Sequence, residues 1–300
     1  MSNFPWLTTI GVIPLIGAVV VMLLPRSKGL LAKQLALVFS LIALGMTIAM
    51  ALQFDADVTD PFQFSESASW IPALGISYSV GVDGIGLVLI GLAATLVPVV
   101  ILAGWHDVDE ELGSVKGYFA LILVLQTLMI GVFAATDVFL FYVFFEAMLV
   151  PIYFLIGRYG GPQRAYAAVK FLIYSLVGGL FMLASLIGLY VVSGRQLGEG
   201  TFDFLSLVGL EMDSTTQRLL FLGFFFAFAI KAPLFPFHTW LPDAAKESTP
   251  GTAVLLIGVL DKVGTFGMIR YLLPIFPEAS QFYAPVVIAM AVIGILYGAL

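Results

Sequence analysis

Three ionisable side chains stand near the middle of long apolar stretches of this 300-residue sequence. Glu146 lies in VFLFYVFFEAMLVPIYFLIG, Lys231 follows seven uninterrupted apolar residues, and Lys262 lies in TAVLLIGVLDKVGTFGMIRYLL. A carboxyl group and an amine can each hold and release a proton, and in apolar surroundings their charges must be balanced by one another or by water. The pattern therefore predicts proton-carrying groups inside a largely apolar fold.

Composition places these residues in a membrane. The chain is 61% hydrophobic and only 11% charged, with a mean hydropathy of +1.07, whereas soluble domains carry about 25% charged residues. Its apolar runs reach the roughly 20 residues that cross a bilayer, and they lack the alternation of a β-barrel. The sequence predicts an all-α polytopic membrane protein.

We expect about nine spanning helices, and the charges of their connections indicate an orientation. Arg26 and Lys28 lie in the first connection, and Arg158 and Arg164 surround the connection after the fifth helix. The connection at 55–81 has four acidic residues and no basic one. By the positive-inside rule, the basic connections are cytoplasmic and the N-terminus lies outside. The expected limits are 4–24, 32–54, 82–104, 116–135, 138–157, 167–193, 217–236, 251–273 and 282–300, with a short interfacial helix around 202–210.

Two structural interpretations compete with a proton pathway. A lysine can extend to an interface and keep its charge in water, and a pair between Glu146 and a lysine can simply hold helices together. A charge at the bilayer centre costs about 2.5–3.5 kcal/mol on insertion scales. Because Lys231 and Lys262 are central in their segments, we favour the pathway and leave the structural pair open.

Pro233 and Pro236 follow Lys231 almost at once and predict a broken seventh helix. A proline has no N–H and clashes with the preceding turn, so carbonyls around 229–232 lose their helical partners. Such carbonyls, and the negative end of a helix, stabilise a nearby cation. Non-helical backbone at this depth is tolerated where it is buried or lines a wet cavity. We expect the proton on Lys231 to depend on the approach of Glu146.

Other residues receive lesser roles. His238 is a secondary candidate for relaying protons because the unperturbed pKa of histidine is near 6.5, although the same ring could hold its loop through a hydrogen bond. Pro151 is expected to bend the fifth helix one turn beyond the acid. Asp261 is expected to be structural, paired with a neighbouring helix or with nothing, and Asp83 and Asp137 are expected to cap helices.

No cofactor or metal is expected in this chain. It has no cysteine, and its two histidines are far apart in sequence, which excludes disulfides and thiolate-bound clusters and leaves no local metal motif. The stretch GVDGIG (Gly81 to Gly86) lacks both the spacing and the lysine of a phosphate-binding loop. The net charge of −6 argues against nucleic acid as a partner, and membrane lipids are expected instead.

Three motifs resemble the antiporter-like subunits of respiratory complex I. They are FFEAMLVPIYFLIGRYGG (Phe144 to Gly161), KAPLFPFHTWLPDA (Lys231 to Ala244) and LLIGVLDKVGTFGMIRY (Leu255 to Tyr271). The second marks a wider superfamily that includes multisubunit cation/proton antiporters. EAMLVP and the run from Gly81 to Trp105 are most similar to the chain M (chain 4) branch of NADH:quinone oxidoreductase subunits, and the resemblance covers nearly the whole chain.

The resemblance implies a fold of fourteen helices in the family, with two inverted five-helix repeats and a broken seventh helix. On this basis residues 1–300 form a single antiporter-like transmembrane domain. Residues 1–110 are leading helices, 111–273 are the first five-helix repeat with the proton-channel residues, and 274–300 are a connecting helix. The sequence stops inside an apolar segment, so we expect the natural chain to continue.

The resemblance also implies the roles of the buried charges. Glu146 pairs with Lys231, and Lys262 is the central proton-carrying residue. The expected protein is a membrane-arm subunit of proton-pumping NADH:quinone oxidoreductase in the inner cell membrane. It neighbours other complex I membrane subunits, especially antiporter-like chains, while flavin, iron–sulfur clusters and quinone bind elsewhere. Two alternatives stay open: a subunit of a multisubunit sodium/proton antiporter, and a scaffold whose charges only hold helices together.

Overall fold

A computed structural model describes residues 4–58, 60–108 and 114–299 of the chain. Within these ranges, eight helical segments are long and apolar enough to cross a membrane. The segments are α1 (Trp6–Leu23), α2 (Gly29–Ala51), α3 (Gly84–Ala103), α4 (Val115–Ala134), α5 (Val138–Ala147) continued by α6 (Leu149–Tyr159), α7 (Arg164–Leu197), the span at 250–275, and α14 (Pro277–Ala299). The span at 250–275 consists of α11 (Pro250–Leu255), η3 (Leu256–Leu260), α12 (Asp261–Gly267), η4 (Met268–Leu272) and α13 (Leu273–Ile275), where η3 and η4 are π-helical turns.

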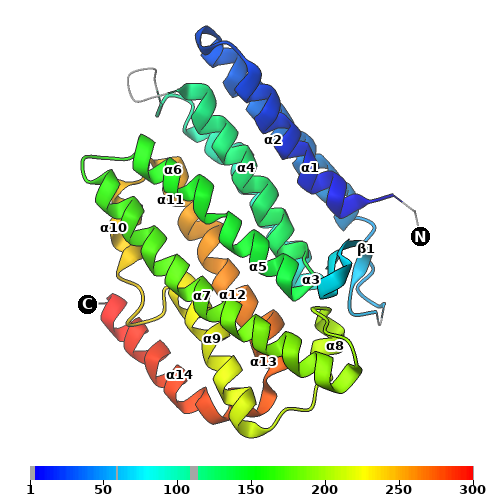
Figure 1. The fold of residues 1–300 in the computed structure, drawn as a ribbon. Coiled ribbons are helices and arrows are strands. Elements are labelled where there is room, and N and C mark those ends of the chain that lie inside the picture. Colours follow the sequence, from blue (N-terminus) through cyan, green and yellow to red (C-terminus); the bar gives the residue numbers. More distant parts are fainter. Residues whose placement is uncertain (1–3, 59, 109–113, 300) are drawn as a thin grey trace.

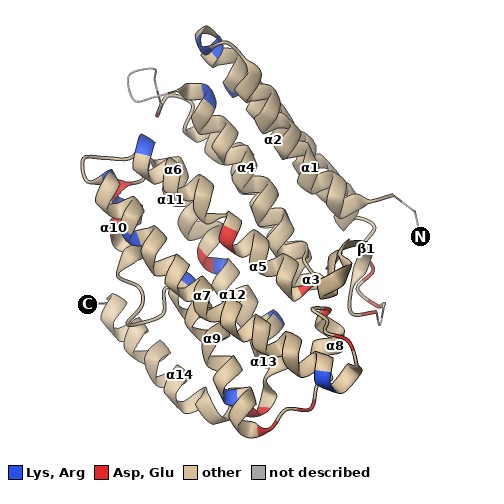
Figure 2. Cartoon of the chain, in the orientation of Figure 1, with Lys and Arg blue, Asp and Glu red and all other residues tan. Residues whose placement is uncertain are grey.

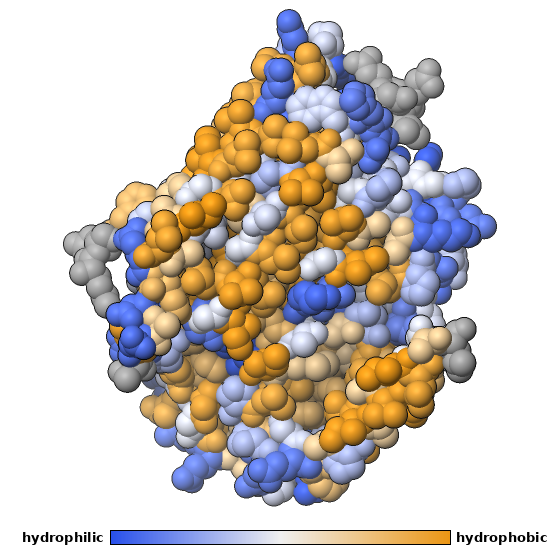
Figure 3. Space-filling view, turned by 180° about the vertical axis from the view of Figure 1, so that it is seen from behind, coloured by the Kyte–Doolittle hydropathy of each residue, from blue (hydrophilic) through white to orange (hydrophobic). Residues whose placement is uncertain are grey.

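The helices form a bundle in which α4 is central (Figure 1). Helix α4 packs against α1, α2, α3, α5 and α6, and most of its residues are buried. Helices α1 and α2 form one edge of the bundle and α14 forms another (Figure 1). Within α14, Ala279 is the single buried residue. The outer surface is mostly hydrophobic, as the rear view in Figure 3 shows, which is the surface expected of a protein that faces lipid.

The seventh expected span, 217–236, ends early and is broken as predicted. Helix α9 (Ser214–Lys231) stops at Lys231, residues 232–239 are not helical, and α10 (Trp240–Glu247) follows. Pro233 and Pro236 explain the break because neither can donate a backbone hydrogen bond to the preceding turn. The short helix expected around 202–210 is present as α8 (Phe204–Val208).

The connection at 55–81 contains an antiparallel hairpin that the expectation of an all-α chain missed. Strand β1 (Gln63–Ile71) pairs with β2 (Ile76–Val82). The turn between them ends at Gly75, whose φ of 62° is a left-handed conformation that glycine adopts without strain. Polar and apolar residues alternate along ISYSV in β2, as in a strand with two different faces. The hairpin lies at one end of the bundle, and the spans themselves are helical.

Charged residues gather at the two ends of the bundle (Figure 2). The end formed by the α1–α2 connection, the start of α4 and the α6–α7 connection is mainly basic, whereas the end with the hairpin and α8 is mainly acidic. Between the ends, Figure 2 shows charged residues only near a few helices, including α5, α7 and α12. The few interior charges therefore stand apart from the solvated ends.

Asp83 joins the hairpin end to the span at 250–275. As predicted, it caps α3, because its carboxylate accepts the Gly86 N–H at 2.7 Å. The same carboxylate forms an ion pair with Arg270 of η4. The guanidinium of Arg270 also lies 4.8 Å from the ring centroid of Phe62 and 5.1 Å from that of Phe266. One buried arginine thus connects three separate parts of the chain.

Short backbone bridges tie the hairpin to two further connections. The N–H of Thr136 donates to the carbonyl of Ser79 at 2.9 Å, and the N–H of Val138 donates to the carbonyl of Phe202 at 2.8 Å. The turn between α4 and α5 is therefore held between β2 and the segment before α8. This junction fixes the start of α5, the helix that carries Glu146.

Asp137 lies at the centre of this junction and caps α5, as predicted. Its carboxylate accepts the N–H groups of Phe139 and Leu140, both at 2.9 Å, and that of Ser77 at 3.1 Å. Burial raises the pKa of the Asp137 carboxyl, and these backbone hydrogen bonds only partly oppose the rise. Because the pKa of this carboxyl is higher in the folded state than in the unfolded state, the folded protein loses stability as the pH rises from the unfolded-state pKa to the folded-state pKa.

We predict that Asp137→Ala lowers the stability of the fold by about 1–2 kcal/mol, since it removes an N-cap and a cross-link to β2. Asp137→Asn keeps an acceptor oxygen without the buried charge and should cost less. Thermal unfolding in detergent measures both changes, with Asp213→Ala, which removes the exposed cap of α9, as the matched control. Equal losses for Asp137→Ala and Asp213→Ala would contradict a special role for the junction.

Candidate functional site

Glu146 lies at the end of α5, where its span is interrupted. Helix α5 ends at Ala147, Met148 adopts a turn, and α6 starts at the next residue. Pro151 has no N–H to donate to the carbonyl of Ala147, which explains the interruption. The helix is thus interrupted two residues after the acid, nearer to it than the bend predicted one turn beyond.

Lys231 is the last residue of α9 and is 1% exposed. Its Nζ lies 4.8 Å from the ring centroid of Phe145 and 5.8 Å from that of Phe171. The Glu146 carboxylate is near enough to interact with this ammonium electrostatically, although the two do not form a direct ion pair in the described structure. Aromatic faces and the negative end of a helix both favour a cation. The structure thus brings Glu146 and Lys231 together in an interior site.

Two glycines of α7 allow this approach. A Cβ atom added at Gly179 would collide with the carboxylate of Glu146. One added at Gly178 would lie 3.1 Å from the Cα of Ala227 in α9. This part of α7 therefore makes close helix contacts, and Gly179 leaves the space that the Glu146 carboxylate occupies.

The break after α9 is closed by new hydrogen-bond donors. The indole Nε1 of Trp240 donates to the carbonyl of Ile230 at 2.8 Å, and the N–H of Leu234 donates to the carbonyl of Ala229 at 2.8 Å. The carbonyls of Ala229 and Ile230, which were expected to be free to stabilise a cation, therefore already accept hydrogen bonds. Trp240, which is 1% exposed, gives no sign of this role in the sequence, where it reads as an aromatic residue at a helix end.

Several buried polar side-chain atoms find no hydrogen-bond partner among the described residues. Leaving such a group unsatisfied costs about 1–3 kcal/mol, so clusters of them are informative. Ser175 lies on the face of α7 that includes Phe171 and Gly179, one helical turn from each. Sequence reasoning missed Ser175 and Gln126, although each is a polar residue in a long apolar run. The atoms belong to Gln126 and Thr127 of α4, Glu146, Ser175, Lys231 and His238. The guanidinium of Arg270 also lacks a hydrogen bond but is ion-paired with Asp83.

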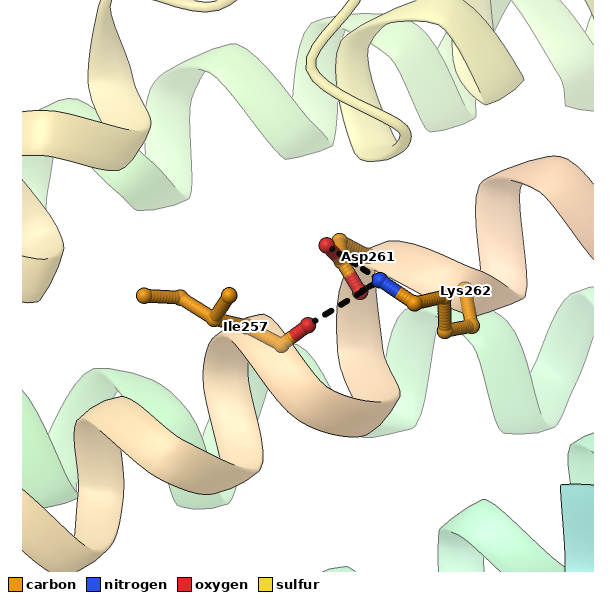
Figure 4. A network of polar contacts seen from close by, with 3 residues as sticks. All are labelled: Ile257, Asp261 and Lys262. Carbon is orange, nitrogen blue, oxygen red and sulfur yellow. Dashed lines mark hydrogen bonds and ion pairs between the residues drawn. The ribbon is translucent and has the colours of Figure 1, made fainter. Parts of the chain in front are cut away.

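The structure does not bring Lys262 to the other two charges. Its side chain is 47% exposed, and its Nζ lies 2.9 Å from both carboxylate oxygens of Asp261 (Figure 4). The same Nζ donates to the carbonyl of Ile257 at 3.3 Å (Figure 4). Lys262 also lines an apolar groove of about 370 Å³ between α3 and α12. The three charges were expected to lie together, but only Glu146 and Lys231 do. Asp261 pairs with the adjacent Lys262 rather than with a residue of another helix.

The helix that carries Lys262 nevertheless packs directly against the break. A Cβ atom added at Gly264 of α12 would collide with the backbone of Ala232, the residue after Lys231. The two lysines therefore extend from backbone segments that touch, while the side chain of Lys262 turns to the outer surface.

His238 lies in the non-helical segment after the break. Its ring stacks on Phe235, with centroids 5.6 Å apart, and lies 5.1 Å from the ring of Tyr297. Its Nδ1 is one of the atoms without a partner, so the alternative hydrogen bond to the loop is not made by this nitrogen. Among the described residues, no group of three or more His, Cys, Asp or Glu side chains is arranged to hold a metal ion.

Comparison with known proteins identifies a family. A family model described as "NADH:quinone oxidoreductase/Mrp antiporter, TM" matches residues 135–300. NADH-quinone oxidoreductase subunit M of Mycobacterium tuberculosis is 47% identical, and the match covers 100% of this chain and 60% of the relative. NADH-ubiquinone oxidoreductase chain 4 of Chondrus crispus is 36% identical, over 96% of this chain and 56% of the relative. This chain thus spans little more than half the length of these relatives.

Solved structures agree with the sequence matches. A chain of respiratory complex I from Thermus thermophilus with bound NADH superposes with a TM-score of 0.82 at 30% identity, covering 98% of this chain and 58% of that one. A chain of the Mrp complex from Dietzia sp. DQ12-45-1b gives a TM-score of 0.75 at 22% identity, covering 92% of this chain and 29% of that one. The second likeness concerns the fold alone.

We predict that Gly179→Ala displaces the Glu146 carboxylate and lowers the thermal unfolding midpoint of the protein in detergent, because the added methyl group occupies the place of the carboxylate. The matched control is Gly45→Ala in α2, where a Cβ meets nothing within 4 Å. In a helix interior this control should gain about 0.5–1 kcal/mol. A Gly179→Ala protein as stable as the control would contradict the described packing.

Proposed function

This chain belongs to the NADH:quinone oxidoreductase/Mrp antiporter transmembrane family, and we propose that it acts as a chain M-type membrane-arm subunit of a proton-pumping NADH:quinone oxidoreductase. The observation that carries the proposal is the buried Lys231 at the break of α9, held beside Glu146 of α5. The relatives named subunit M and chain 4 support the choice of subunit. NADH oxidation and quinone reduction, with their flavin and iron–sulfur clusters, then belong to other subunits.

The Glu146–Lys231 pair serves as a proton switch in this proposal. Each charge is costly in an apolar interior without the other, because removing one partner of a buried pair leaves an uncompensated charge. An ionised Glu146 therefore favours a protonated Lys231, and neutralising Glu146 favours release of the lysine proton. A small movement of α5 at its interruption changes the separation of the pair and hence the affinity of Lys231 for its proton.

The proposed route continues from this pair through polar groups that need water. Ser175 lies one helical turn from Phe171, which contacts Lys231, and one turn from Gly179, which contacts Glu146. Gln126 of α4 is 0% exposed, and neither atom of its amide group has a hydrogen-bond partner among the described residues. Ordered water usually satisfies such groups in protein interiors. Lateral transfer then reaches Lys262 across the contact between α12 and the break, and the exit lies in the part of the full-length relatives beyond the matched region. His238 is a secondary relay candidate.

The charge distribution supports an orientation for this route. The basic end of the bundle is cytoplasmic by the positive-inside rule, so the N-terminus and the hairpin lie on the opposite side. Protons are taken up at the basic end and leave at the acidic end. The chain is placed in the inner cell membrane, with other antiporter-like chains of the complex as its neighbours.

We predict that Glu146→Gln and Lys231→Met each slow NADH-driven proton pumping about tenfold or more, since a positioned proton-transfer group typically contributes about 10²–10⁴-fold. Lys262→Ala should have the same effect. Acidification of inverted membrane vesicles measures pumping, and Lys246→Met, which changes an exposed lysine outside the spans, is the control. Full pumping in a variant that still assembles would remove that residue from the pathway.

Two alternatives are distinguished in the same vesicles. A sodium/proton antiporter subunit, which the family description also covers, would move protons on addition of sodium without NADH. A scaffold role would show as joint loss of assembly and pumping in every charge variant. Sodium-independent pumping that is lost in assembled variants supports the complex I function over both.

A further inference from the structure

A groove opens on the outside of the bundle between α1 and α6. Both helices pack on α4, which lies between them in Figure 1. Small residues form the floor of the groove, namely Ala18 of α1 together with Gly117 and Ala120 of α4. Its volume is about 430 Å³, within the range of about 300–1,000 Å³ that is usual for small-molecule sites. The groove is therefore large enough to hold part of a small molecule or a lipid chain.

Apolar side chains form its walls. Val19 of α1 and Phe154 of α6 line the groove from opposite sides and are 54% and 46% exposed. No carboxylate is among the lining residues. In a membrane such walls accept a hydrocarbon chain and offer nothing to a free inorganic anion.

One of the residues that line this groove is positively charged, and it lies at one end of the groove. Arg158 lies in the last turn of α6, at the basic end of the bundle. Its guanidinium lies 5.8 Å from the ring centroid of Tyr159 and pairs with no carboxylate among the described residues. Nearby Lys116 is already engaged, because its Nζ donates to the carbonyls of Met22 and Leu24 at 2.8 and 2.7 Å. Arg158 is thus the groove's available partner for an anion.

We propose that this groove is a binding site for an anionic phospholipid, with an acyl chain between α1 and α6 and the phosphate on Arg158. A guanidinium matches phosphate oxygens in a two-point contact, and basic pockets between spanning helices are suited to anionic headgroups. A zwitterionic phospholipid has the same phosphate, but its ammonium group offsets the phosphate charge and weakens the attraction to the arginine. A soluble phosphate leaves the apolar walls unused. This lipid site requires that the protein is inserted in a membrane, but it does not depend on the proposed proton pathway.

Native mass spectrometry of the assembled complex, delipidated and then titrated with phosphatidylglycerol or phosphatidylcholine, tests the proposal. We expect tighter retention of phosphatidylglycerol on this chain. Arg158→Gln should weaken that retention about fivefold, the effect of losing one basic contact at a lipid surface. Arg26→Gln removes an exposed arginine at the same end but outside the groove and should retain the lipid as the unmodified protein does.

A second variant tests the groove separately from the charge. Val19→Trp fills the groove from its exposed wall and should reduce retention of both lipids while Arg158 is intact. Unchanged unfolding midpoints show that the variants are folded. Equal retention by Arg158→Gln and Arg26→Gln, equal affinity for the two lipids, or a neighbouring protein helix seated in the groove of the assembled complex would each overturn the proposal.

Discussion

The charge of Lys231 has to be balanced inside a membrane, and the arrangement of α5, α7 and α9 follows from that constraint. Its ammonium is almost completely buried at the C-terminal end of α9. Three features counter the cost of this burial: the carboxylate of Glu146, the faces of Phe145 and Phe171, and the negative end of the helix dipole. Each of these features requires that a helix packs close to the ammonium of Lys231, so the electrostatic balance of this site depends on the local helix packing.

The surrounding helices show how this proximity is achieved. Glycines on α7 leave room for the Glu146 carboxylate and for the backbone of α9. Trp240 returns from α10 to occupy a carbonyl that the break exposes. At the far end of α5, Asp137 and the hairpin fix where the helix starts. Two interruptions, after Glu146 and after Lys231, therefore occur in an otherwise firmly packed region, where small movements change the distance between two charges.

Much of this arrangement was readable in the sequence because its causes are local. Continuous apolar runs predicted the spans, and Pro233 and Pro236 predicted the break in α9. The isolated charges predicted an interior polar site, and the resemblance implied that Glu146 and Lys231 pair there. The hairpin was missed because its alternation is short and lies in an acidic connection. Ser175 was passed over because a single hydroxyl in an apolar helix gives little sign of which face is buried.

The position of Lys262 could not be read from sequence for a specific geometric reason. The π-helical turn η3 directly precedes α12, and such a turn inserts one residue into the α-helical register. Each residue turns an α-helix by about 100°, so the insertion rotates all later side chains relative to a regular helix. No local residue pattern predicts this π-helical turn. It belongs to the packing of the whole span, and with it Lys262 faces the outer groove, where its ammonium pairs with the adjacent Asp261.

The central claim is that the space between Glu146 and Lys231 is polar and reachable by water. Because the chain has no cysteine, Ser175→Cys places a single thiol on the face of α7 between the two charges. Its labelling by a small, water-soluble thiol reagent, measured by the mass of this chain, reports water access, since the reactive form is the thiolate. The account predicts that Cys at 175 reacts while Cys at the neighbouring lipid-facing Leu176 does not. An unreactive thiol at 175, in a folded and assembled protein, would contradict it.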